Sequence, residues 1–186
     1  DFGWTIALAV AAAACTRGIV LLAHWSAVRV ARRPWALIPA SALLVGALAI
    51  CFQLITDESA NVVLFSGEDS FGALLDPSAD LALSTLALLL LFKGAAWALS
   101  MGSFRGGPTF PALFIGAVGG LIAAELPGYS ETPAIAAVMA ATAVSILRLP
   151  LSAVVITLLL TGSAGAAVAP IVIVAVVVAY ITIESM

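Results

Sequence analysis

Long apolar segments constrain this chain more than any other feature of its sequence. The stretches at 4–28, 36–55 and 79–101 are each about as long as a helix that crosses a bilayer, which needs roughly 20 residues. Hydrophobic residues make up 63% of the 186-residue chain and charged residues only 9%, more apolar surface than a soluble domain of this size can bury. The sequence therefore predicts an integral membrane protein.

The apolar segments predict helices and no strands. They are continuous, do not alternate with polar residues, and exceed the roughly ten residues of a barrel strand. Small residues in "GAVGG" and "AVMAAT" favour close helix packing. We expect an all-α, polytopic membrane bundle and one transmembrane domain over 1–186. Because the chain starts at Asp1 and stops abruptly at "YITIESM", we expect a fragment of a longer membrane protein.

Charged and aromatic residues mark the ends of the predicted spans. An arginine-rich loop at 29–33, followed by Pro34, is expected on the cytoplasmic side. The segment 57–80 is acidic and lacks Lys and Arg, and its runs "ANVVLF" and "SFGALL" suit only short helices. Four tryptophans are interpreted as an aromatic belt at the membrane interface: Trp4, Trp25, Trp35 and Trp97. Cys15 and Cys51 lie inside apolar runs, which favours packing residues over a disulfide.

The second half of the chain is divided into short segments by proline and glycine. Helices are predicted at 109–126, 133–147, 150–162 and 169–184, and most are too short for a simple span. Short or Gly/Pro-interrupted hydrophobic segments are the best sequence indicator of a transport site. A helix that starts or stops within the membrane must have its end buried in protein or beside a water-filled path. This pattern predicts broken or re-entrant helices.

The stretch "GSFRGGPTFPALFIG" (102–116) is the most unusual of these interruptions. Pro111 suits the first turn of a helix, so the helix is expected to begin at Thr109 or its neighbour, with Thr109 as N-cap. A helix N-terminus carries a partial positive charge and free N–H donors. Gly106 and Gly107 would let an ion approach the backbone. The stretch therefore predicts an anion site held by main-chain amides.

The candidate anion-binding residues are Gly106, Gly107, Pro108, Thr109, Phe110 and Pro111. Arg105 is a candidate charge on the anion path, since intramembrane cations are functional candidates by default. Arg105 could equally cap loop carbonyls or pair with a carboxylate. Lys93, within the preceding span, is expected to snorkel outward or to pair rather than to take part in transport.

The region "LLLLFKGAAWALSMGSFRGGPTFPALFIGAVGG" resembles the CLC family of chloride channels and chloride/proton antiporters. In that family a glycine-rich loop precedes a helix whose N-terminus points at chloride. The segment "AATAVSILRLPLSAVVITLLLTG" is similar to the family's next region. The resemblance implies the C-terminal half of a CLC membrane domain, one half of an inverted repeat. It also implies chloride or a similar anion as substrate, a lipid bilayer, a homodimer and a missing N-terminal half as partners, and a bacterial-type plasma membrane as location.

The chain departs from the family motif inside the candidate site. The family has an apolar residue and Phe after the second glycine, where this chain has Pro108 and Thr109, with Phe110 next. Pro108 has no N–H, so one of the two main-chain donors that the resemblance implies is lost. Thr109 keeps its N–H and adds a hydroxyl. These departures predict an altered anion affinity or selectivity.

Other classes of function have less support in the sequence. One His, no metal-spaced cluster and carboxylates confined to loops and helix ends predict no catalytic residues, no metal and no cofactor. The net charge of -3 gives no indication of nucleic-acid binding. The alternatives to anion transport are a non-conducting structural or interaction subunit and an intramembrane enzyme. The sequence leaves open whether transport is passive or coupled to protons.

Overall fold

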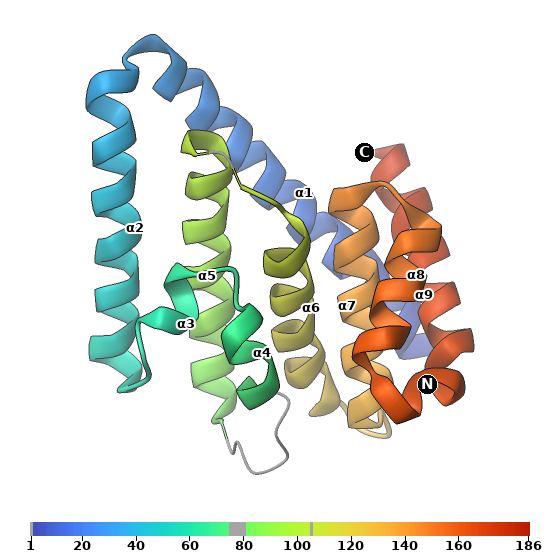
Figure 1. Ribbon diagram of the computed structural model, residues 1–186. Helices are drawn as coiled ribbons and strands as arrows, with labels where there is room; N and C mark the ends of the chain where they lie inside the picture. Colours follow the sequence, from blue (N-terminus) through green and yellow to red (C-terminus); the bar gives the residue numbers. More distant parts are fainter. Residues whose placement is uncertain (1, 75–80, 105) are drawn as a thin grey trace. The chain divides into compact units, whose positions relative to one another are not determined.

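The computed structural model describes residues 2–74, 81–104 and 106–186, and throughout these ranges the regular structure is helical (Figure 1). Within these described ranges, four helices (α1, α2, α5 and α9) are long and apolar enough to cross a membrane, whereas α6, α7 and α8 are apolar but shorter. The predicted all-α membrane fold is therefore confirmed. The helices in chain order are α1 Phe2–Arg32, α2 Pro34–Thr56, α3 Asn61–Leu64, α4 Glu68–Leu74, α5 Leu83–Ser103, α6 Thr109–Ala124, α7 Glu131–Leu147, α8 Pro150–Leu160, the 3-10 turn Gly162–Ala164 and α9 Gly165–Ser185.

The chain forms two compact units, and each is described by itself. The central unit is Gly18–Pro111, and the terminal unit combines Asp1–Arg17 with Ala112–Met186. The boundaries fall inside α1 and α6. The single transmembrane domain expected over 1–186 stays a prediction.

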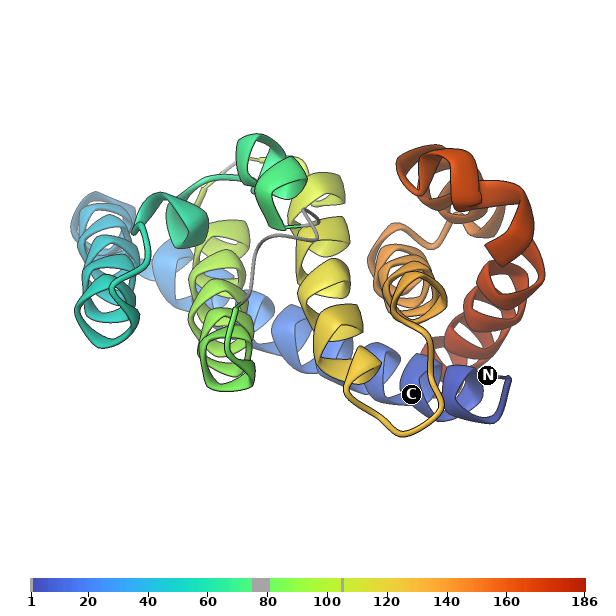
Figure 2. The same ribbon diagram turned by 90° about the horizontal axis from the view of Figure 1, so that it is seen from below.

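The terminal unit is built on α7, α8 and α9, which all pack against one another (Figure 2). Its core uses small side chains, and most of α7 is fully buried. Gly116 and Gly120, one turn apart on α6, lie directly against the main chain of Met139 and Ile135 in α7. In lipid there is no hydrophobic driving force for helices to associate, so small residues that allow close van der Waals packing stabilise the contact. The small-residue faces predicted from "GAVGG" and "AVMAAT" thus meet here.

The central unit pairs α2 with α5, and α3 packs against both. Phe52 and Phe92 join the two long helices with ring centroids 6.0 Å apart and planes tilted by 57°. At the other end of α5, a hydroxyl cluster joins three helices. Ser103 Oγ donates to Ser41 Oγ at 2.9 Å and lies 3.2 Å from Ser26 Oγ.

The arginine-rich loop predicted at 29–33 is mostly helix. α1 continues to Arg32, so Arg33 alone separates α1 from α2. The arginines predict a loop from their charge, but the helix ends only where Pro34 follows. Arg33 has φ −146° and ψ 67°, outside the helical region, as expected for a residue before proline. Pro34 then opens α2, where its missing N–H costs little.

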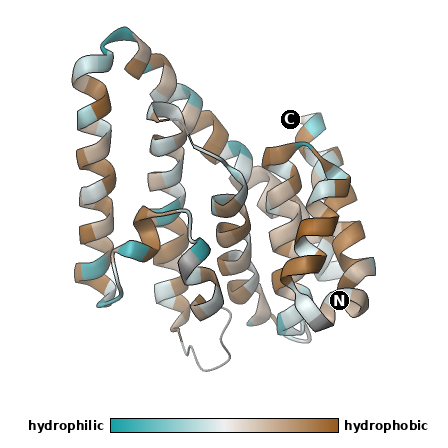
Figure 3. Ribbon diagram, viewed as in Figure 1, coloured by the Kyte–Doolittle hydropathy of each residue, from teal (hydrophilic) through white to brown (hydrophobic). Residues whose placement is uncertain are grey.

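Many apolar side chains on the long helices are exposed, as contact with lipid would allow. On α2, Leu43 and Leu54 are 76% and 77% exposed, and Figure 3 shows hydrophobic residues along most of this helix. Both cysteines are free in the structure. Both are exposed, however, so their interpretation as packing residues is wrong.

Candidate functional site

Helix α6 begins at Thr109, as the sequence predicted. Thr109 is the first helical residue, so Pro108 rather than Thr109 immediately precedes the helix. Such one-residue differences at helix ends are common, since terminal turns are irregular. Pro111 lies in the first turn, where a helix has unsatisfied N–H groups and loses little to proline.

A cavity of about 260 Å³ lies in the central unit next to this helix start. The predicted residues Gly106, Gly107 and Pro111 line it, whereas Pro108, Thr109 and Phe110 are not among its lining residues. Arg105 falls outside the described residues. The full lining is Val63, Leu64, Phe65, Ser66, Lys93, Ala96, Trp97, Ser100, Met101, Phe104, Gly106, Gly107 and Pro111.

One face of α5 forms a wall of the cavity. Its lining residues recur at helical spacing from Lys93 through Trp97 to Ser100, which places them along one side of the helix. Trp97 is only 8% exposed, so its assignment to an interfacial belt is wrong. The helical spacing of Lys93 and Ser100 is a signal in the sequence that could have indicated this polar face.

Among the described residues that line the cavity, Lys93 is the charged one, and it is 1% exposed. Its Nζ donates to the carbonyl oxygens of Val62 at 2.5 Å and Phe65 at 2.7 Å, at the end of α3. The expectation that Lys93 snorkels outward is therefore wrong. The ammonium instead satisfies carbonyl groups that a short helix leaves without intrahelical partners. A buried cation beside an intramembrane cavity is a functional candidate.

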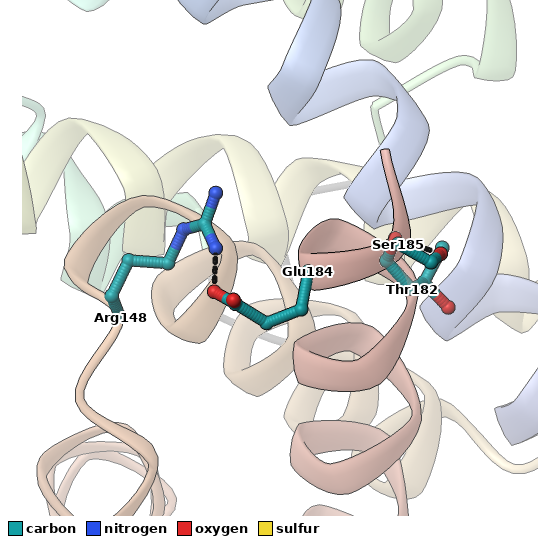
Figure 4. Close-up of polar contacts among 4 residues, drawn as sticks. All are labelled: Arg148, Thr182, Glu184 and Ser185. Carbon is teal, nitrogen blue, oxygen red and sulfur yellow. Dashed lines mark hydrogen bonds and ion pairs between the residues drawn. The ribbon is translucent and has the colours of Figure 1, made fainter.

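An ion pair is found in the terminal unit. Arg148 follows α7 in the left-handed region (φ 57°) and pairs with Glu184 near the end of α9 (Figure 4). Both side chains remain substantially exposed, at 41% and 54%. Such a pair links the α7–α8 turn to α9 and contributes little to stability where it is solvated.

The described part of the chain contains no group of three or more His, Cys, Asp or Glu side chains that could hold a metal ion. The donors around the cavity are hydroxyl, ammonium and main-chain groups. Such groups bind an anion by hydrogen bonds and partial charges, without a covalent step.

Four membrane-length helices, short apolar helices and a cavity at a helix start together define a polytopic membrane protein. A family model described as "Voltage gated chloride channel" matches residues 1–184. The chain therefore belongs to the voltage-gated chloride channel family, and the resemblance seen in its sequence is confirmed. Searches of curated proteins and of solved structures find no significant match. Family membership supports anion transport in general and agrees with the prediction that the chain is not an enzyme.

Proposed function

We propose that this protein transports chloride and that the anion is held beside the start of α6. The observation that carries the proposal is the shared cavity, which is lined both by Gly106, Gly107 and Pro111 and by the buried Lys93. Glycine backbone and a helix start supply donors and partial positive charge, and Lys93 supplies a full charge nearby. Family membership supports an anion as the substrate.

The balance of these charges suits release as well as binding. Lys93 already donates to two carbonyl oxygens at the end of α3. The partial negative charges of these oxygens reduce the positive potential that Lys93 presents to an anion. At the helix start, Thr109 and Phe110 have N–H groups, whereas Pro108 and Pro111 have none. Conduction needs sites that are favourable enough to enter and weak enough to leave. We infer a chloride site of moderate affinity, coordinated by the main-chain amides of Gly106 and Gly107, which line the cavity, and by those of Thr109 and Phe110 at the helix start beside it.

The proposal covers both passive conduction and proton-coupled exchange. Chloride flux of the full-length protein in liposomes, measured with and without a proton gradient, separates the two. A passive channel transports chloride equally in both conditions, whereas an exchanger moves protons against chloride. The location in a bacterial-type plasma membrane stays a prediction.

We further propose that the protein acts as a homodimer and that the expected N-terminal half completes each pathway. On α9, Ile173, Val177 and Ile181 are exposed by 50%, 49% and 62% at spacings of four residues. This β-branched stripe supports a helix contact along 169–180. Single cysteines at Ile173 and Val177 should crosslink full-length subunits. Exclusively monomeric protein at high lipid dilution would contradict the dimer.

A side chain placed at Gly107 tests the anion site directly. A Cβ there meets nothing within 4 Å, and Gly107 is not in a left-handed conformation, so the fold should tolerate Gly107→Leu. The new side chain would enter the open space beside the cavity and should reduce chloride flux by about tenfold or more, which corresponds to about 1.4 kcal/mol. Gly46→Leu is the matched control, since Gly46 also meets nothing within 4 Å and lies on α2. Equal flux in both variants would favour the non-conducting alternative for this loop.

A further inference from the structure

The turn between α1 and α2 concentrates positive charge, and neither of the two helices that it joins contains a carboxylate. Arg29 and Arg32 occupy the last turn of α1, Arg33 follows, and all three side chains are exposed. The chain has no Asp or Glu from residue 2 to residue 56, and α5 has none either. The next carboxylate, Asp57, lies beyond the opposite end of α2, about 35 Å away for a 23-residue helix.

No ion pair involves these three arginines within the described residues. The cationic cluster is therefore not part of an internal salt-bridge network. Figure 3 shows this turn as hydrophilic, next to helices with hydrophobic surfaces. An uncompensated group of guanidinium ions at a span end requires an external anion or bulk water.

Two exposed tryptophans flank this cluster in the sequence, one on each helix. Arg29 Cζ lies 3.4 Å from the Trp25 ring centroid, a cation–π contact that orients the guanidinium. Trp25 is 50% exposed and Trp35 is 94% exposed. Exposed tryptophans prefer the headgroup level of a bilayer. A guanidinium stacked by one face keeps its edge N–H donors available for a phosphate.

Apolar side chains continue the surface below the cluster. Leu21 and Val28 on α1 and Ile38 on α2 are 54%, 44% and 39% exposed. A ligand bound here would therefore meet cations at one end and hydrocarbon at the other. Free phosphate uses only the cations, whereas a phospholipid uses both. These observations favour a lipid over a soluble anion.

We propose that the α1–α2 turn is a binding site for an anionic phospholipid. Arg29, Arg32 and Arg33 bind the headgroup phosphate, and Trp25 fixes the Arg29 guanidinium for that contact. The acyl chains lie along the apolar surface that starts at Leu21 and Ile38. This site is separate from the chloride cavity and does not depend on the proposed transport function.

Native mass spectrometry of the full-length protein with phosphatidylglycerol and phosphatidylcholine tests the site. The wild type should retain phosphatidylglycerol selectively. Each basic residue near an anionic headgroup changes binding by roughly fivefold, so Arg29→Gln, Arg32→Gln and Arg33→Gln together should lower retention by roughly a hundredfold. Arg148→Gln is the control, because Arg148 is also exposed but already paired with Glu184. Equal retention in the triple variant and the wild type would overturn the proposal.

Two further measurements keep the test decisive. If the triple variant fails to fold, Trp25→Leu preserves the charge and an apolar side chain but removes the stack, and should still lower phosphatidylglycerol retention. Unchanged retention in a folded Trp25→Leu protein would contradict the role of the stack and overturn the site as proposed. Displacement of phosphatidylglycerol by millimolar inorganic phosphate would show that the cluster recognises a free anion, and would also overturn it.

Discussion

A Cβ built on Gly116 of α6 would lie only 2.5 Å from the Cα of Met139 in α7. The two helices therefore meet backbone to backbone at this point, and Gly120 repeats the contact one turn later against Ile135. No flexible side chain lies between them that could move aside. The packing of α6 on α7 depends on glycine at these positions.

Gly116→Ala should destabilise the protein by about 1–3 kcal/mol, because a methyl group cannot fit without a shift of the α7 backbone. Thermal unfolding in detergent would measure the change. Gly46→Ala is the control, since its Cβ meets nothing within 4 Å and alanine favours a helix. Equal melting temperatures for the two variants would contradict the close contact.

Ser103→Ala should cost about 1 kcal/mol in unfolding free energy. The hydroxyl of Ser103 donates to Ser41 and contacts Ser26, so its loss removes a link among α1, α2 and α5. Ser130→Ala is a suitable control, because Ser130 is exposed and makes no side-chain cap hydrogen bond. An equal loss of unfolding free energy in Ser130→Ala and Ser103→Ala would contradict a stabilising role for the Ser103 hydroxyl.

Lys93→Met should weaken chloride binding and loosen α3. A unit charge several ångströms from the anion contributes on the order of 2 kcal/mol at an effective dielectric constant of about 20, so affinity should fall by on the order of tenfold. Hydrogen exchange should rise at Val62–Phe65, whose carbonyls lose the ammonium donor. Lys93→Gln removes the charge but keeps a donor, so it should weaken chloride binding with less effect on exchange. Wild-type affinity in both variants would exclude Lys93 from the anion site.

The protein should lose folding stability at alkaline pH because of Tyr129. This residue follows α6, and its hydroxyl is 2.9 Å from Thr5 Oγ1. Burial raises the pKa of Tyr129 above its usual value near 10, an effect that the Thr5 hydrogen bond partly opposes. The unfolded chain therefore releases this proton at lower pH than the folded protein, so stability should fall as pH rises through about 10. Tyr129→Phe should flatten the decline in a melting series across that range, and an unchanged decline would contradict the assignment.

The sequence predicts most helices because several apolar runs end beside a proline or glycine, such as Gly102, Pro127 and Gly162. Thr109 was identified as the start of α6 from Pro111, which fits only an early helical position. The extension of α1 through Arg32 is not predictable from charge, because the helix ends where Pro34 follows and not where the arginines begin. The start of α9 at Gly165 was also missed, since Pro170 is tolerated one turn or more inside the helix.

The cavity was only partly predictable from the sequence. Gly106 and Gly107 were found through their local motif. Lys93 was assigned elsewhere because its partners are main-chain carbonyls of Val62 and Phe65, about thirty residues away. Carbonyl groups belong to every residue and leave no sequence pattern, so only the packing of α3 on α5 reveals that contact.

Chloride titration calorimetry of the full-length protein, with Pro108→Ile and Thr109→Val, tests the central claim most directly. A hydrogen bond to a charged partner contributes roughly 1.5–3 kcal/mol, or about ten- to hundredfold in affinity. Pro108→Ile restores a main-chain N–H at the start of α6, so chloride should bind more tightly. Thr109→Val removes only the hydroxyl and should weaken binding by less than one full hydrogen bond. Unchanged affinity in both folded variants would contradict an anion site at the start of α6.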